Sequence, residues 1–367
     1  MDSGDVVIIG AGLIGLSLAF ELAERGATVR VFDKAEPGKG ASWAGAGMLA
    51  PYTENIEDEE LLGLCVRSLE MYPAYVRAVR EQSGIDPHLQ LDGIVSPAFD
   101  ADALQRLRAR IKRLRAHGAT CEILNRKQTL TLEPGIGKHT VGAMLVRGEG
   151  QVDNRRLGRA VLAACEERRV RVKTQVAELA VECSARRVLG VRTDRGFVSA
   201  DAVVNAAGAW AAQLPGIPAQ YIPKVRPVKG QMLALEIPRG FMRHVAWVPG
   251  AYLVPRADGR LLVGATVEEA GYDTRTTAAG IQELLHAAIE AAPALRDFTV
   301  SEMWAGLRPG TPNQRPFLGQ TKLDGYFLAT GHYRNGILLA PVTAKLLADE
   351  IQGALQDKGA QYANLEW

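Results

Sequence analysis

Three glycines near the start of the chain have the spacing of a phosphate-binding turn. Gly10, Gly12 and Gly15 form a G-x-G-x-x-G pattern, and Asp33 follows Gly12 by 21 residues. In such a pattern the first glycine permits a tight turn, the second lets the backbone approach a pyrophosphate, and the third lets a helix pack closely on a strand. An acidic side chain placed like Asp33 can accept hydrogen bonds from a ribose diol. These residues predict a dinucleotide site without distinguishing NAD from FAD.

The elements around the glycines are those that this motif requires. The apolar run 5–9 is typical of a parallel strand buried on both faces, and apolar residues from Leu13 onwards recur at helical spacing. Gly26 is a suitable helix end, and the β-branched run 28–32 predicts a second strand. The phosphates would then meet a helix N-terminus, which offers unpaired N–H groups and the positive end of the helix dipole.

A second run of small residues, 38–51, favours FAD. Glycine, alanine and serine predominate in it, so the backbone could closely approach a flat, electron-rich group. A plain nicotinamide fold would instead proceed to its next strand and helix. Trp43, Met48 and Leu49 argue against the alternative of a mobile linker, because they are large and apolar.

Together these segments resemble the FAD-binding start of the D-amino-acid oxidase superfamily. Within it, residues 40–43 followed by 46–51 resemble the glycine oxidases of the thiamine pathway. Later segments match the same family in the same order: 203–210, 252–256, 264–268, 306–310 and 331–341. The resemblance covers most of the chain.

The resemblance implies an α/β fold with two domains. A discontinuous, Rossmann-like FAD-binding domain would comprise 1–90, 146–222 and 305–367, and an α+β substrate domain on an antiparallel sheet would comprise 91–145 and 223–304. Within them we expect strands at 170–172 and 198–204. We also expect a β-hairpin over 252–263, turning at Asp258-Gly259.

The resemblance also assigns the cofactor residues. FAD would be bound without a covalent link, since the flavin-tethering cysteine of some relatives lies in the C-terminal half and this chain has no cysteine after Cys183. The expected FAD contacts are Gly10, Gly12, Leu13, Ile14, Gly15, Asp33, Lys34, Ala41, Ser42, Ala46, Gly47, Met48, Val176, Ala207, Gly208, Tyr333, Arg334, Asn335, Gly336, Ile337 and Leu338. Asp33 stands where relatives commonly carry glutamate. An apolar helix is expected directly after Asn335-Gly336, with its N-terminus toward the flavin.

Arg308, Tyr252 and Arg334 are the expected substrate residues. A guanidinium matches a carboxylate with two parallel hydrogen bonds, and Arg308 matches the family's carboxylate-binding arginine. Tyr252 matches a tyrosine that helps to hold the same carboxylate, and Arg334 is placed on the flavin edge and the substrate side. Some relatives carry a histidine where this chain has Gly250, so no general base is assigned.

The implied reaction is oxidative deamination of glycine, and of sarcosine or small D-amino acids. Hydride would pass from the α-carbon to flavin N5, giving an imine or glyoxylate, ammonia and hydrogen peroxide, with O2 as acceptor. The imine could be handed to a thiazole synthase, and the family suggests a homotetramer. Three alternatives stay open: a broad D-amino-acid or sarcosine oxidase, a tRNA-modifying FAD oxidase domain, and a flavin-bearing subunit without turnover.

Composition narrows the choice. Apolar residues make up 47% and charged residues 23%, as in soluble globular proteins, and the net charge is only +2. We therefore expect neither a nucleic-acid nor a membrane partner. The four cysteines are scattered, and the start of the chain is acidic rather than basic, so a cytoplasmic protein without a metal site is expected. A basic helix over 104–116 is expected to face solvent or a second subunit, and a nucleic-acid patch is the alternative.

Overall fold

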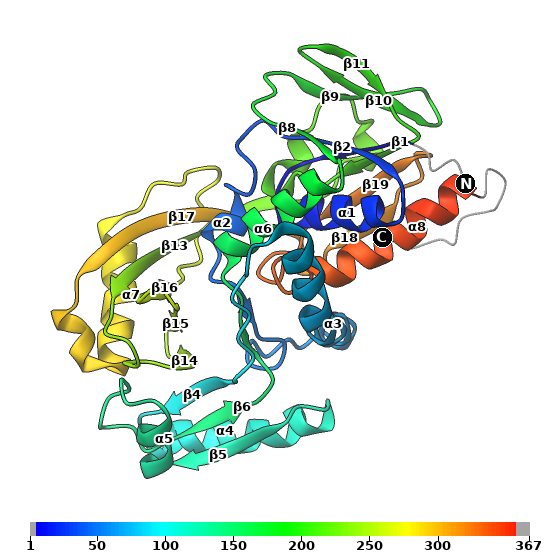
Figure 1. Cartoon of the computed structure of the whole chain (residues 1–367). Helices are drawn as coiled ribbons and strands as arrows, with labels where there is room; N and C mark the ends of the chain where they lie inside the picture. Colours follow the sequence, from blue (N-terminus) through cyan, green and yellow to red (C-terminus); the bar gives the residue numbers. More distant parts are fainter. Residues whose placement is uncertain (1–4, 357–367) are drawn as a thin grey trace.

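A computed structural model describes residues 5–356 and is built around two large sheets (Figure 1). The first sheet has the strand order β18–β19–β12–β1–β2–β8, and every pairing in it is parallel except β18 with β19. Its strands are β1 (Asp5–Ile9), β2 (Thr28–Phe32), β8 (Arg171–Lys173), β12 (Ala202–Asn205), β18 (Phe317–Gln320) and β19 (Tyr326–Thr330). Because the chain returns to this sheet from three distant segments, the fold around β1 is discontinuous.

The glycine turn has the predicted form. β1 leads into α1 (Leu13–Glu24), the helix ends before the left-handed Gly26, and β2 follows. A Cβ atom on Gly15 would lie 2.0 Å from the carbonyl oxygen of Gly10, and one on Gly10 would lie 2.3 Å from the oxygen of Ala206. Both positions therefore exclude a side chain, as the motif requires.

The two faces of the first sheet are covered differently. Val6 and Ile8 of β1 pack with the helices, whereas Val7 and Ile9 pack toward a three-stranded antiparallel meander. The helices are α1, α3 (Glu59–Ser83), α6 (Asn154–Glu167) and α8 (Ala340–Gln356), and the meander is β9 (Leu179–Cys183), β10 (Val188–Thr193) and β11 (Gly196–Ser199).

The meander corrects the expected strand over 198–204. Val198 belongs to β11 and pairs with Val191, whereas Val203 belongs to β12 and pairs with Val7 of β1. The chain changes sheets between them at Ala200 and Asp201. Residues 198–204 are continuous in sequence, but only their second half reaches the buried centre of the parallel sheet.

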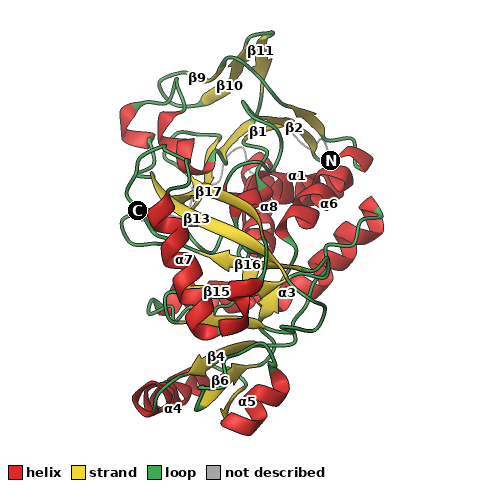
Figure 2. Ribbon diagram, turned by 90° about the vertical axis from the view of Figure 1, so that its left-hand side faces the viewer, coloured by secondary structure: helices red, strands yellow, loops and turns green. Residues whose placement is uncertain are grey.

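The second sheet has eight strands in the order β17–β13–β16–β15–β14–β4–β6–β5, antiparallel except for β14 with β4. They are β4 (Ile94–Ala98), β5 (Cys121–Asn125), β6 (Gly142–Val146), β13 (Arg226–Glu236), β14 (Val245–Val248), β15 (Ala251–Pro255), β16 (Arg260–Gly264) and β17 (Val300–Gly310). Helix α7 (Ala278–Ala291) packs on its outer face, and α4 (Ala101–Ala116) and α5 (Arg126–Leu132) lie at the β4–β6–β5 end, opposite the β9–β11 meander (Figure 2). Among residues 5–356, no helix has both the length and the apolar character needed to cross a bilayer.

The predicted hairpin is confirmed as β15 and β16, with Leu253 opposite Val263 and a left-handed Gly259 in the turn. The expected domain boundary at 304/305 is wrong, because it falls inside β17, which pairs with β13 across that point. The other boundaries stay predictions. Residues 1–4 and 357–367, assigned to the FAD-binding domain, lie outside the described residues.

The remaining short elements lie in the connections between the larger strands and helices. They are α2 (Ala41–Ala44), β3 (Met48–Leu49), β7 (Gly150–Gln151) and the 3₁₀ turns Gly208–Gln213, Ala219–Tyr221 and Pro293–Asp297. Of these, α2 and β3 lie within the run of small residues singled out above, and β3 pairs with β7.

Candidate active site

A cavity of about 650 Å³ extends from the glycine turn after β1 to the face of the second sheet. Gly12 and Asp33 line it at one end, and Tyr252 and Arg308 line it at the other. The run of small residues around α2 lines it between these ends. A volume of this size is typical of a site for a large ligand.

Gly12 shows that the first end is shaped for a ligand rather than for internal packing. A Cβ atom there would meet only the Ser42 hydroxyl, at an ordinary 3.5 Å, so the fold itself would accept a side chain. The N–H of Leu13 donates to Ser42 Oγ (2.9 Å), and the N–H of Ile14 has no acceptor among residues 5–356. An open space beside a free N–H at a helix N-terminus suits a phosphate group.

Asp33 lies at the end of β2 with both carboxylate oxygens on the same side of the cavity as the glycine turn. Its Oδ2 accepts from the N–H of Ala11 (2.6 Å), and its Oδ1 accepts from the N–H of Ala35 (2.8 Å). A carboxylate has about four acceptor positions, so capacity remains for the hydroxyls of a ribose. Lys34 also lines the cavity.

The run of small residues is held rigidly by donors from distant elements. Its carbonyl groups accept hydrogen bonds from distant residues, among them Ser42 O from Asn154 Nδ2 (2.8 Å), Ala44 O from Trp304 Nε1 (2.9 Å) and Ala46 O from Arg256 Nη2 (2.9 Å). Gly47 is left-handed, and a Cβ atom on it would lie 1.9 Å from Val152 O. The segment is therefore a fixed wall of the cavity, which excludes the alternative of a mobile linker.

Arg256 is a residue whose role sequence reasoning missed. It is buried, and besides Ala46 O it contacts Asn154 Oδ1 (2.8 Å) and Val152 O (3.1 Å). Burial lowers its pKa to about 10. Its only sequence signal was membership of the matched segment 252–256, because a structural arginine and a surface arginine look alike without their partners.

The segment after Arg334 corrects the expected helix start. Residues 336–339 form a turn, with Leu339 N donating to Asn335 O (2.7 Å), and α8 begins only at Ala340. Pro341 in the first turn of α8 favours this start, because proline lacks the N–H that a helix interior needs. The N–H groups of Gly336, Ile337 and Leu338 find no acceptor among residues 5–356. They can serve an electron-rich ligand edge.

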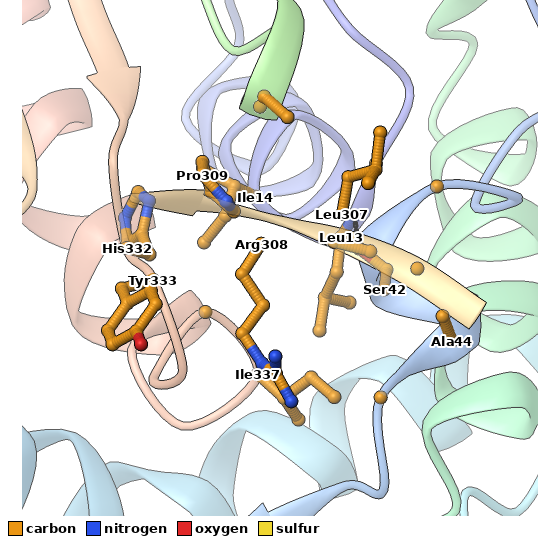
Figure 3. A pocket seen from close by; sticks show the side chains of 18 of the residues that line it. Leu13, Ile14, Ser42, Ala44, Leu307, Arg308, Pro309, His332, Tyr333 and Ile337 are labelled. Carbon is orange, nitrogen blue, oxygen red and sulfur yellow. Dashed lines mark hydrogen bonds between the residues drawn. The ribbon is translucent and has the colours of Figure 1, made fainter. Parts of the chain in front are cut away.

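Arg308 dominates the other end of the cavity. Its guanidinium lies across Gly230 of β13, where a Cβ atom would be 2.4 Å from Nη2. Its Nη1 donates to Thr266 O (3.1 Å) and to Lys229 O (3.3 Å). Figure 3 shows the side chain extending from β17 into the space bounded by Tyr333 and Ile337. Apart from these two carbonyl groups and the neighbouring Tyr252 hydroxyl, the guanidinium has no partner among the described residues, so donors remain that can meet an anion.

Tyr252 and Arg334 complete this end. The Tyr252 ring lies over Gly264, where a Cβ atom would be 2.7 Å from the hydroxyl, and the hydroxyl is 3.8 Å from Met232 Sδ. Burial raises the pKa of Tyr252, and the adjacent Arg308 opposes this shift. Arg334 is exposed, with its guanidinium carbon 5.1 Å from the centre of the Tyr333 ring. The three predicted substrate residues thus line one end of one cavity.

Comparison with known proteins identifies the family. The sequence profile of the FAD dependent oxidoreductase family DAO matches residues 5–350. The chain belongs to this family. The predicted FAD dependence and α/β fold are therefore confirmed.

Relatives within this family support the resemblance to glycine oxidases. The glycine oxidase of Pseudomonas aeruginosa is 34% identical, with 95% of this chain and 94% of the relative covered. The crystal structure of glycine oxidase from Geobacillus kaustophilus superposes with a TM-score of 0.89 at 34% identity, covering 96% of this chain and 95% of that one.

A third relative, the bifunctional protein ThiO/ThiG of Synechocystis sp., is 39% identical over 95% of this chain. This chain spans about half of its length, 52%.

The residues present fit the family's FAD. The free N–H of Ile14 and the space at Gly12 suit the pyrophosphate, Asp33 suits a ribose, and the free N–H groups after Asn335 suit the flavin pyrimidine edge. Of the predicted FAD residues, all line the cavity except Gly15, Val176, Asn335 and Leu338. Gly15 acts in helix packing, and Val176 lies behind Asp33, donating its N–H to Asp33 O (3.1 Å).

Proposed function

We propose that this chain oxidises glycine with FAD and O2. The observation that carries the proposal is the Arg308 guanidinium, which keeps free donors directed at the cavity end beside Tyr252. Its fork matches the carboxylate of an amino acid. The aromatic pair Trp247 and Tyr252, with ring centroids 6.0 Å apart, narrows this end and favours a small substrate.

The residues of the chain position the substrate and shield it. Arg308 and Tyr252 would hold the carboxylate and thereby orient the α-carbon toward the cavity interior. Met232 and Trp247 would keep water from the reacting bond. Bound FAD supplies the acceptor for the hydride that leaves the α-carbon. The imine product would hydrolyse to glyoxylate and ammonia, while O2 is reduced to hydrogen peroxide.

The relatives support two finer parts of the proposal. Glycine oxidases match this chain over nearly their full length, which supports glycine as the substrate. Fusion of a similar sequence in ThiO/ThiG proteins supports delivery of the imine to a thiazole synthase. A homotetramer and a cytoplasmic location stay predictions from the sequence.

The contacts of the basic helix α4 support its role in packing over the alternative of a nucleic-acid patch. Of the six cationic side chains on α4, three donate to carbonyl groups of this chain: Arg110 to Tyr52 O and Thr53 O, Arg113 to Ile56 O, and Arg115 to Cys121 O. Half of the basic residues on this helix therefore brace neighbouring segments of the chain.

We expect the purified protein to be yellow, with FAD released into the supernatant by acid precipitation. None of the four cysteines lines the cavity, and three of them are buried elsewhere. Pigment that remains with the precipitated protein would refute non-covalent binding.

Peroxide release from glycine, sarcosine, D-alanine, D-proline and D-phenylalanine tests the substrate. Glycine should be oxidised at least as well as D-alanine, and bulky D-amino acids should be poor substrates. A preference of more than about tenfold for D-proline or D-phenylalanine, about 1.4 kcal/mol, would instead indicate a general D-amino-acid oxidase.

A further inference from the structure

We propose that Glu54 binds the ammonium group of the amino-acid substrate and accepts its proton. This inference rests on the proposed function, and it supplies the acid–base group that the sequence did not reveal.

Glu54 lies in the tight turn between β3 and α3, with its N–H donating to Ala50 O (3.0 Å). It lines the same cavity as Arg308, Tyr252 and Arg334 and is half-buried. Its carboxylate has no hydrogen bond and no ion pair within 4.0 Å among the described residues. An unpaired carboxylate near two arginines, inside a ligand cavity, is available for a cationic group of the ligand.

The turn that carries Glu54 is fixed by hydrogen bonds to the side chain of Glu149. The Glu149 side chain is fully buried; its Oε1 accepts from the N–H groups of Tyr52 (2.5 Å) and Thr53 (3.0 Å), and its Oε2 accepts from the Thr53 hydroxyl. Arg110 of α4 donates to Tyr52 O and Thr53 O, both at 2.7 Å. Donors and acceptors on both sides of residues 52–53 thus place the next residue, Glu54, at a defined point of the cavity wall.

The charges at this end complement a zwitterion. Arg308 would take the carboxylate of glycine, and Glu54 would take its ammonium group. In the proton transfer an N–H bond breaks, its electron pair stays on nitrogen, and the proton forms an O–H bond with the carboxylate of Glu54. The nitrogen lone pair can then form the C=N bond as the α-C–H leaves with its electron pair, so electrons and protons balance.

The surroundings suit a proton acceptor. Burial raises the pKa of Glu54, and the positive charges of Arg334 and Arg308 oppose that shift. The negative charge of Glu54 in turn raises the pKa values of its ionisable neighbours Tyr252, Cys65 of α3 and Glu149. A carboxyl group with a raised pKa is a stronger base toward an ammonium than an ordinary surface carboxylate.

The experiment compares the FAD-loaded wild type with Glu54→Gln, Glu54→Asp and the control Glu57→Gln, which changes an exposed residue outside the cavity lining. The first readout is binding of 2-aminoisobutyrate and isobutyrate, followed by the change in flavin absorbance. Both ligands carry a carboxylate, only the first carries an ammonium, and the first lacks an oxidisable α-C–H. The second readout is kcat/KM for glycine as a function of pH.

Glu54→Gln should lower the preference for 2-aminoisobutyrate over isobutyrate by about tenfold or more, while isobutyrate binds as tightly or more tightly. At pH 7 its kcat/KM should fall about 10²-fold and then rise about tenfold per pH unit as the solution supplies neutral amine. Glu54→Asp should recover part of both effects, and Glu57→Gln should match the wild type.

Three results separate the hypotheses. Unchanged ligand preference in Glu54→Gln would overturn the role of Glu54, as would equal weakening of both ligands. A wild type that releases no peroxide from glycine would overturn the proposed function, while the ligand pair would still decide whether Glu54 recognises an ammonium.

Discussion

The two ends of the cavity present different parts of the chain to a ligand. The FAD end, as we assign it, presents mainly backbone N–H groups and the spaces beside small residues, as at Gly12 and Ile14, with the Asp33 carboxylate as the exception. The proposed substrate end presents charged or polar side chains, namely Arg308, Tyr252 and Glu54, supplied by β17, β15 and the turn after β3. The first end is shaped by steric exclusion, and the second is shaped by charge.

This difference predicts two kinds of sensitivity. A side chain added at the FAD end either collides with the backbone, as at Gly15, or enters the space proposed for the ligand, as at Gly12, so its effect is on folding or on cofactor binding. A side chain removed at the substrate end leaves the frame intact and changes binding and turnover. Variants at the two ends of the cavity can separate effects on folding and cofactor content from effects on substrate binding and turnover.

The largest effect is expected for Arg308→Ala. A substrate carboxylate in the closed cavity would lose its partner, which costs on the order of 3–5 kcal/mol, or about 10²–10³-fold in kcat/KM. Most of the loss should appear as a raised KM, with FAD content unchanged. Arg308→Lys should recover part of it, because an ammonium keeps the charge and loses the fork. A kcat/KM for glycine within threefold of the parent would show that Arg308 does not hold the substrate.

Gly15→Ala and Gly12→Ala test the FAD end of the cavity. The first places a Cβ atom 2.0 Å from Gly10 O and should destabilise the protein by about 3 kcal/mol or more. The second meets only Ser42 Oγ at 3.5 Å, so the unfolding free energy of the FAD-free protein should change by less than about 1 kcal/mol. FAD affinity should nevertheless fall about tenfold or more in Gly12→Ala. Normal FAD affinity in that variant would contradict the assignment of the space to the pyrophosphate.

The pH dependence of the unfolding free energy tests the role of Glu149, which holds the turn before Glu54. Burial raises the pKa of Glu149 from 4.5 to about 7 in the folded protein. The contribution of the protonated Glu149 side chain to the free energy of unfolding is therefore fully present below pH 4.5. It is lost as the pH rises through 7, a change of about 3 kcal/mol.

Glu149→Gln cannot titrate at this position. Urea unfolding between pH 5 and 8 should show the wild type losing stability relative to this variant as the pH rises. A difference that does not change with pH would show that Glu149 keeps an ordinary pKa.

The smallest effect is expected for Arg110→Ala on α4, with Arg106→Ala on the same helix as its control. Arg110→Ala should cost about 1–2 kcal/mol in unfolding free energy, because the carbonyls of Tyr52 and Thr53 lose their donor. It should also raise KM for glycine, since the turn that carries Glu54 loosens. Arg106→Ala, at an exposed position of the same helix, should stay within about 0.5 kcal/mol and leave KM unchanged.

The sequence by itself determined the features that depend on neighbours along the chain. The strand, glycine turn, helix and second strand through Asp33 follow from local spacing and backbone sterics. The hairpin at Asp258-Gly259 follows from turn chemistry, and the family follows from segments in a characteristic order. The local elements were predictable because the residues that specify each of them are close in sequence, and the family was predictable because each of its segments can be read by itself.

Only the tertiary structure decided which distant groups meet. Arg256 reaches Ala46 across 210 positions, and the turn before Glu54 is held by Glu149 from 96 positions away. Residues 198–204 divide between two sheets for the same reason, since burial by other segments determines which half joins the parallel core. No periodicity records such contacts, so Glu54 became a candidate proton acceptor only when the fold placed it in the cavity with Arg308.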